Sequence, residues 1–139
     1  MGRHEQREQV FALLFREEFH APGDMPEQVK LFLENNEVIV SQKDADYITA
    51  RYEQIHEKLT ELDETINKKA EGWDTKRMGK TELTVLRIAA YEILFDEEIP
   101  DSVAINEAVE IAKKYGQEAS GGFVNAVLAK IAKSGDSNS

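Results

Sequence analysis

The segment from Lys80 to Phe95 constrains the fold of this chain more strongly than any other stretch. Its apolar residues would surround a helix axis, and a helix that is apolar nearly all round must be covered by other elements. We therefore expect it to be the central helix of an all-α bundle, following a connector over Gly72–Gly79 that contains the only tryptophan, Trp73. Arg87 and Glu92 are polar positions inside it, so each must reach the surface or be paired.

The most regular pattern lies earlier in the chain. Ser41 with Asp44 is a helix-start signal, and apolar residues then recur at alternating steps of three and four. That spacing predicts one long amphipathic helix over about residues 45–66. A free coiled coil has the same pattern, but the neighbouring segments carry apolar faces of their own, which favours a folded bundle. The stripe consists of Ala45, Ile48, Tyr52, Ile55, Leu59, Leu62 and Ile66.

Two shorter helices are expected before this stretch. The first covers about residues 3–19, and the second covers about residues 24–35. Asp24 can cap the second helix, with Glu27 three residues later as its reciprocal partner. The apolar face of the first helix consists of Val10, Phe11, Leu14 and Phe15.

Two more helices are expected after the central one. Asp101 or Ser102 can cap the first of them, and Gly116 suits the left-handed position after its last turn. Asn106 and Asn125 lie among apolar residues of these helices, so we expect both to be buried and hydrogen bonded. The last helix carries the apolar residues Phe123, Val124, Val127, Leu128 and Ile131.

The chain has 139 residues and no cysteine, which excludes a disulfide framework, a thiolate metal site and a Cys nucleophile. No run approaches the roughly 20 apolar residues that a membrane-spanning helix needs, and the first ten residues lack the apolar stretch of a signal peptide. We therefore expect a cytoplasmic protein that does not associate with membranes. Residues 1–133 form the expected helical domain, and residues 134–139 form an expected disordered polar tail.

No motif in the sequence favours an enzyme. The sequence contains no P-loop or dinucleotide fingerprint. His4, His20 and His56 are isolated and lack metal-ligand spacing, and we expect His56 to be a solvated surface residue. We predict no cofactor and no metal. The net charge of −10 argues against nucleic-acid binding unless one face of the molecule concentrates cations.

Three segments together resemble the NusB family of transcription antitermination factors. Their order and spacing match from the first helix to about Lys133, whereas residues 22–71 match only in helical character. The segments are Arg3, Arg7 and Glu8 leading into Phe11–Phe15; K-T-E-L-T-V-L-R-I-A-A-Y-E-I-L at 80–94; and A-I-N-E-A-V-E-I-A-K-K-Y-G at 104–116, followed by Ser120 and F-V-N-A-V-L at 123–128.

The resemblance implies an all-helical fold of about six or seven helices in two small subdomains around a shared core. It also implies a function. Members of the family bind the boxA element of nascent RNA as a heterodimer with the small-subunit ribosomal protein NusE. The complex tethers the RNA to the elongating RNA polymerase and suppresses termination, notably on ribosomal RNA operons. Some members are monomers and others self-associate, so a homodimer is left open.

The same resemblance places RNA-binding residues at Arg3, His4 and Arg7 and at Phe123. Arginine pairs with phosphates through charge and fork geometry, and an aromatic ring can stack on an unpaired base. On the residues alone, solvated charges are the simpler interpretation of the arginines, and a core position is the simpler interpretation of Phe123. Glu82 matches an acid that contacts the ribosomal-protein partner, although a first-turn glutamate also favours a helix dipole.

Two departures from the family pattern remove positive charge from the expected RNA face. Glu5 and Glu8 accompany the N-terminal arginines, and Gly122 stands where relatives often carry a basic residue. The alternative function is therefore an acidic protein–protein scaffold with little RNA affinity. A helical accessory domain of an RNA methyltransferase ranks last, because this length leaves no room for a catalytic domain. If residues other than those of the family pattern bind the RNA, the candidates are Lys113, Lys114 and Lys130.

Overall fold

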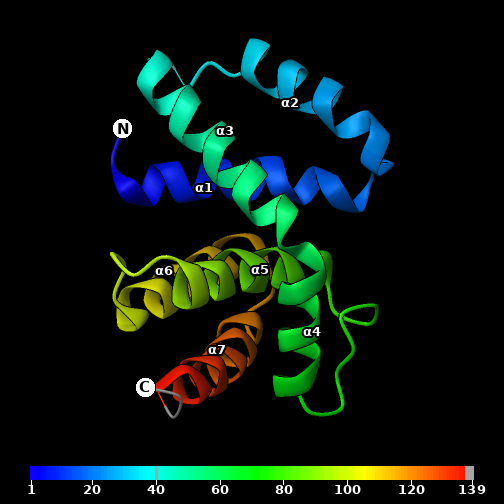
Figure 1. Cartoon of the computed structure of the whole chain (residues 1–139), viewed down its shortest axis with the longest axis vertical. Coiled ribbons are helices and arrows are strands. Elements are labelled where there is room, and N and C mark those ends of the chain that lie inside the picture. Colours follow the sequence, from blue (N-terminus) through cyan, green and yellow to red (C-terminus); the bar gives the residue numbers. More distant parts are fainter. Residues whose placement is uncertain (40, 137–139) are drawn as a thin grey trace. The chain divides into compact units, whose positions relative to one another are not determined.

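The computed structural model describes residues 1–39 and 41–136, without the side chains of 134–136, and the regular structure of these residues is entirely helical. Their helices form two compact units, and the boundary in the chain lies between Glu57 and Lys58 (Figure 1). This confirms the predicted all-α fold in two small subdomains. The elements are α1 (Arg3–Phe15), η1 (Arg16–Glu18), η2 (Pro22–Asp24), α2 (Met25–Glu34), α3 (Gln42–Glu57), α4 (Leu59–Lys69), α5 (Lys80–Phe95), α6 (Asp101–Tyr115) and α7 (Ser120–Asp136), where η marks a 3-10 turn.

In the N-terminal unit, α1 packs against α3. The predicted apolar faces of both helices are confirmed, because most of the residues in them are buried. The exception in α1 is Phe15, which is half-buried, while Leu13 is buried in addition. The buried apolar residues of the two helices are Val10, Phe11, Leu13, Leu14, Ile48, Tyr52 and Ile55.

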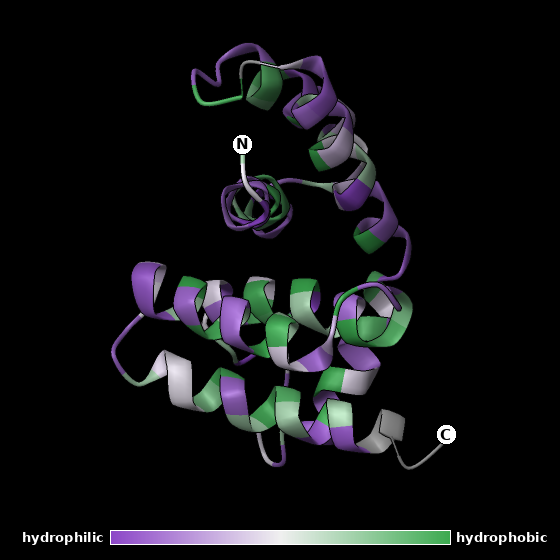
Figure 2. Ribbon diagram, turned by 90° about the vertical axis from the view of Figure 1, so that its left-hand side faces the viewer, coloured by the Kyte–Doolittle hydropathy of each residue, from purple (hydrophilic) through white to green (hydrophobic). Residues whose placement is uncertain are grey.

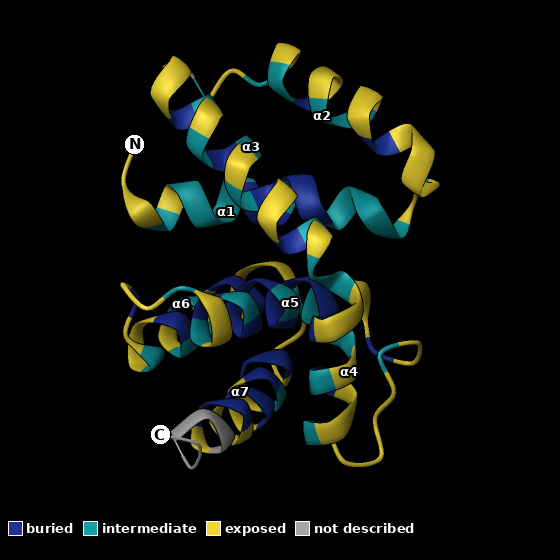
Figure 3. Cartoon of the chain, in the orientation of Figure 1, coloured by how far each residue is buried: buried dark blue, intermediate teal, exposed yellow. Residues whose placement is uncertain are grey.

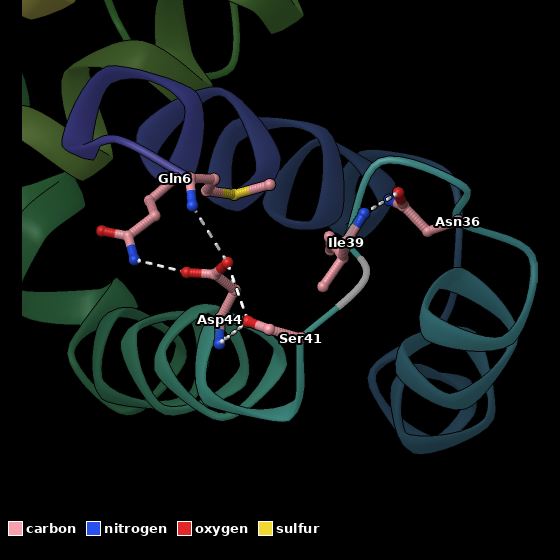
Figure 4. A network of polar contacts seen from close by, with 6 residues as sticks. Gln6, Asn36, Ile39, Ser41 and Asp44 are labelled. Atoms are coloured by element: carbon pink, nitrogen blue, oxygen red, sulfur yellow. Dashed lines mark hydrogen bonds and ion pairs between the residues drawn. The ribbon is translucent and has the colours of Figure 1, made fainter.

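The predicted start of α3 at Ser41 is confirmed, and it lies in a polar network (Figure 4). Ser41 Oγ accepts a hydrogen bond from the backbone N–H of Asp44 at 3.1 Å and donates one to Asp44 Oδ2 at 2.9 Å. Gln6 Nε2 donates to Asp44 Oδ1 at 3.0 Å, and the terminal amine of Met1 lies 3.3 Å from Oδ2. The hydrogen bonds from Gln6 and Ser41 favour the carboxylate, so they hold the pKa of Asp44 below its ordinary value of 3.8.

Asp44→Asn is expected to destabilise the N-terminal unit at neutral pH and to lose this effect in acid. Because the native pKa lies below the unfolded one, the contribution of Asp44 is present above pH 3.8 and disappears as the pH falls through the native pKa. Urea titrations at pH 7 and at a series of pH values below 3.8 measure it. Asp46→Asn, on an exposed carboxylate of the same helix, is the control. An equal loss of stability at every pH would contradict the linkage.

The predicted single helix over residues 45–66 is wrong, because the chain forms two helices there. Lys58 leaves the helical conformation at φ −104° and ψ 7°, so α3 ends at Glu57 and α4 begins at Leu59. The apolar stripe continues across this break, but α3 packs against α1 while α4 packs against α5 and α7. Because Lys58 is not helical, the apolar residues before it can pack with α1 and those after it can pack with α5 and α7. Periodicity reports burial and not the covering element, so it does not reveal the break.

In the C-terminal unit, α5 contacts α4, α6 and α7, as predicted for the central helix. Half of the residues of α5 are buried, and Figure 3 shows them in dark blue on the labelled helix. Figure 2 shows that the helices carry both hydrophobic and hydrophilic residues. Arg87 is paired: its Nε and Nη2 each donate to a carboxylate oxygen of Asp63 on α4 at 2.8 Å. Glu92 is buried, with 3% of its surface exposed.

Two predicted helix caps are wrong. Asp24 makes no side-chain cap bond, because its own backbone is helical at φ −89° and ψ −11° and continues from η2. A capping side chain needs an extended backbone at that position. In α6 the extended residue is Pro100, at φ −60° and ψ 142°, so neither Asp101 nor Ser102 caps the helix.

Asn106 on α6 and Asn125 on α7 are exposed, so the prediction that both are buried is wrong. The core face of α6 contains Ala104 and Ala108, and a residue two positions after Ala104 lies about 200° around the helix. Neighbouring apolar letters in the sequence do not place a helical residue on the apolar face.

The last helix extends beyond the predicted end of the helical domain. The backbone of α7 extends to Asp136, inside the predicted tail of residues 134–139. Residues 137–139 lie outside the described residues, so tail disorder stays a prediction.

Within the described part of the chain, no helix combines the length and apolar character needed to cross a membrane.

Candidate functional site

The first group of predicted RNA-binding residues lies at the start of α1. Arg3 is exposed, whereas His4 and Arg7 are half-buried. His4 Nε2 lies 2.7 Å from a carboxylate oxygen of Glu8, one turn later on the helix. Glu5 stands in the first turn. The helix therefore presents its basic residues together with carboxylates, as the departure from the family pattern predicts.

His56 lies at the surface, as its sequence neighbours suggest, with 38% of its side chain exposed, but its ring is also engaged by other residues. Its Nδ1 pairs with Glu17 Oε1, and its ring stacks on Tyr52 at a centroid distance of 5.7 Å. The hydroxyl of Tyr52 donates to the same Glu17 oxygen at 2.5 Å. Burial, helped by this carboxylate, raises the pKa of Tyr52 well above its ordinary value of 10.0. These contacts join η1 to the end of α3, both within the N-terminal unit, so they hold that unit together.

A hollow of about 700 Å³ lies in the C-terminal unit, where α5 and α7 begin and α6 ends. Its volume falls within the range of binding sites for small ligands. Because two helices begin at its wall, their first N–H groups place partial positive charge there. The residues on which the site argument depends are Trp73, Lys80, Glu82, Tyr115, Ser120 and Phe123.

Glu82, the predicted partner-binding residue, lies on this hollow and links two helix starts. Its Oε1 accepts a hydrogen bond from Ser120 Oγ. That hydroxyl in turn accepts a hydrogen bond from the backbone N–H of Gln117 at 3.0 Å. Ser120 is only 4% exposed, so the contact is sheltered from water. Glu82 is therefore more than a solvated first-turn carboxylate, because it joins the start of α5 to the start of α7.

Gly116 leaves the space that this link requires. Its backbone is extended, at φ −105° and ψ −155°, so the predicted left-handed conformation is wrong. A Cβ at this position would lie 2.7 Å from the carbonyl oxygen of Ala112 and 2.8 Å from Ser120 Oγ. Glycine is required here by close packing and not by backbone conformation.

Phe123 lies on the rim of the hollow and is half-buried. By contrast, Val124 and Leu128 on the same helix are completely buried, at 0% exposed. The Phe123 ring packs edge-on against Trp73, with a centroid distance of 5.9 Å and an interplanar angle of 69°. Trp73 is itself 55% exposed. Phe123 thus stands at the border of the packed core and presents part of its ring to the hollow.

Two of the later lysines lie near this hollow. A Cβ at Gly121 would lie 2.9 Å from Lys113 Cε, so the stem of Lys113 covers the start of α7. Lys114 Nζ lies 5.2 Å from the ring centroid of Tyr115, which lines the hollow. Lys130 instead pairs with Glu71 at 3.3 Å.

Comparison with known proteins identifies the relatives of this chain. The sequence profile of the NusB family matches residues 4–133. Transcription antitermination protein NusB of Lachnoclostridium phytofermentans is 46% identical over 131 residues, which cover 94% of this chain and 98% of that protein. This chain belongs to the NusB family.

Solved NusB structures share the fold. NusB of T. maritima superimposes with a TM-score of 0.83 at 35% identity, covering 96% of this chain and 92% of that chain. A chain in a crystal structure of the antitermination factors NusB and NusE with double-stranded RNA superimposes with a TM-score of 0.77 at 26% identity, covering 96% and 99%. The predicted family resemblance is confirmed.

One stretch of this NusB-family chain is basic and contains an exposed aromatic residue, a pattern that helical periodicity does not reveal. Residues 68–80 have a net charge of +3, although the whole chain has a net charge of −10. Basic side chains around an exposed aromatic residue indicate nucleic-acid contact more than a plain connector. The stretch contains the cations Lys68, Lys69, Lys76, Arg77 and Lys80, the acids Glu71 and Asp74, and Trp73.

Proposed function

We propose that this chain is an RNA-binding transcription antitermination factor. It binds boxA-type single-stranded RNA together with the small-subunit ribosomal protein NusE. The complex tethers the RNA to the elongating RNA polymerase, especially on ribosomal RNA operons. Membership of the NusB family supports this proposal, and so does the likeness to a solved complex of NusB and NusE with RNA.

The observation that carries the proposal is the position of Phe123. A large aromatic ring stands half-buried at the rim of a hollow, at the start of α7, where the family motif places an RNA contact. Partial exposure suits a ring that stacks on an unpaired base. Arg3 and Arg7 would pair with phosphates. His4, which pairs with Glu8, would join them.

Glu82 is proposed to contact the ribosomal-protein partner. It lines the same hollow as Phe123, so the proposed partner and RNA contacts adjoin. Its carboxylate is already ordered by Ser120, which reduces the entropy lost when a cation of the partner binds. Adjoining contacts give a physical reason for RNA affinity that depends on the partner.

A binding assay with boxA-type single-stranded RNA tests the proposed function. We expect weak binding by the chain alone and tighter binding once the ribosomal-protein partner is added. The affinity should fall as salt rises, because cations that neutralise phosphates release counterions. Equal binding to unrelated RNA, or no binding with the partner present, would contradict the proposed function.

Arg7→Ala is expected to weaken RNA binding and to leave the melting temperature nearly unchanged. The charge is lost from a half-buried position on α1, and the slope of log affinity against log salt should fall by about 0.7 for one phosphate contact on a single strand. Lys43→Ala, which removes an exposed cation from α3 of the same unit, is the matched control. A large loss of stability with unchanged RNA affinity would mark Arg7 as structural.

The second candidate is an acidic protein–protein scaffold with the same fold. The net charge of −10 and the His4–Glu8 pair favour it. Binding of the ribosomal protein without any RNA binding by the complex would support this candidate. The sequence leaves self-association as a homodimer open, and sedimentation of the chain over a range of concentrations tests it.

A further inference from the structure

We propose that Trp73 is a second stacking residue of the RNA site. An unpaired base of single-stranded RNA enters the hollow beside Phe123 and stacks on the Trp73 indole. The basic side chains that flank Trp73 in the sequence bind the adjoining phosphates. This inference rests on the proposed RNA-binding function, and it adds a residue and a loop that the three family motifs do not include.

The aromatic rings of the hollow provide the stacking surface. Trp73 is 55% exposed and Tyr115 is 46% exposed, which is unusual for side chains with so much apolar area. Trp73 and Phe123 meet edge-on at 69°, so one of the two rings keeps both of its faces clear of the other. Base–aromatic stacking uses such a face, and every base offers a matching one.

Charge favours RNA as the occupant. Lys76, Arg77 and Lys80 are exposed. The two acids of the segment are engaged inside the unit: Asp74 Oδ1 accepts a hydrogen bond from the backbone N–H of Lys76 at 2.9 Å, and Glu71 pairs with Lys130. A local excess of positive charge on an acidic protein attracts a polyanion and not an acidic protein surface.

The loop holds Trp73 in place before any ligand binds. Gly72 has φ +82°, a conformation that favours glycine. The backbone N–H of Trp73 donates to Ala70 O at 3.1 Å, and that of Thr75 donates to the side chain of Asn67 at 2.7 Å. Met78 anchors the far end with only 8% of its surface exposed. A ring held in this way loses little freedom when a base stacks on it.

Intrinsic fluorescence provides the direct test, because Trp73 is the only tryptophan. We expect boxA-type RNA to quench its emission and to protect it from acrylamide, with the ribosomal-protein partner present and its own signal subtracted. An unchanged emission and unchanged acrylamide quenching at saturating RNA would overturn the proposal.

Variants separate the Trp73 contribution from the rest of the RNA site. Trp73→Ala should weaken binding of labelled boxA-type RNA by about 5- to 150-fold, the range that stacking on one base gives. Trp73→Phe should keep most of the affinity, because a flat ring remains. Phe95→Ala is the matched control: it removes an aromatic ring that is 40% exposed at the other end of α5.

The cations of the loop have their own measurement. Lys76→Ala and Arg77→Ala should each lower the slope of log affinity against log salt by about 0.7. Lys133→Ala, which removes an exposed lysine from the last turn of α7, should leave the slope unchanged. Equal slopes in all three variants would contradict phosphate binding by the loop.

The outcomes distinguish this inference from the proposed function. If Trp73→Ala binds RNA like the wild type while Phe123→Ala does not, the inference fails and the proposed function stands. If Trp73→Ala loses the ribosomal protein in an assay without RNA, Trp73 is a contact of the protein partner and not of RNA, and the inference also fails. If the wild type with its partner binds no boxA-type RNA, the proposed function itself fails. Melting temperatures check that each variant is folded.

Discussion

Phe123→Ala is expected to weaken RNA binding about 5- to 150-fold while the C-terminal unit keeps its fold. The lost stacking energy is about 1–3 kcal/mol for one base. The cost in stability is expected to be smaller than for a core phenylalanine, because the ring is only half-buried and packs against an exposed tryptophan. Fluorescence anisotropy of labelled boxA-type RNA, with the ribosomal-protein partner present, measures the affinity.

A second substitution at Phe123 separates stacking from packing. Phe123→Leu keeps apolar bulk but removes the aromatic face, so it should lose RNA affinity nearly as much as the alanine variant and lose less stability. Urea unfolding of both variants provides the comparison. If alanine unfolds the C-terminal unit while leucine restores both fold and RNA affinity, then Phe123 is a core residue and the proposed stacking role is wrong.

Leu128→Ala is expected to destabilise the C-terminal unit by about 2–5 kcal/mol, since it removes a completely buried side chain and leaves a cavity. Leu128 lies on α7, which packs against α4, α5 and α6, so the surrounding helices have little freedom to close the space. Circular dichroism during urea unfolding measures the change. The loss is a large part of the stability of a small domain, so the folded fraction should fall at physiological temperature.

Asn125→Ala is the matched control for that experiment, because it alters an exposed position on the same helix. Alanine favours a helix more than asparagine does, so we expect a change within about 0.5 kcal/mol. A comparable loss of stability in both variants would contradict the prediction, because it would mean that the burial of Leu128 does not account for the loss.

The helical elements could be predicted largely from local patterns. Lys80–Phe95 is a helix with the predicted bounds, and Ser41 precedes α3 and accepts a hydrogen bond from its first turn, as its helix-start signal predicts. Such signals act over one or two turns, so the sequence contains them completely. The break at Lys58 depends on which core covers each half of a continuous stripe, and that is a property of contacts far apart in the sequence.

The candidate site was less predictable. The family motifs point to Phe123 and Glu82, but they do not show that both line one hollow or that Ser120 donates to Glu82. Apolar spacing places Trp73 only in a connector, although the basic residues around it are present in the sequence. A loop residue has no periodicity to reveal its neighbours, so its contact with Phe123 appears only in the structure.

The sequence by itself determined the helical class of this protein, the position of its central helix and its family, because these follow from apolar spacing and matching motifs. The tertiary structure decided which residues meet: Arg87 with Asp63, Glu82 with Ser120, and Trp73 with Phe123. Spacing within a helix fixes the direction of a side chain relative to its own axis. The partner it reaches depends on how separate helices pack, and no local pattern contains that information.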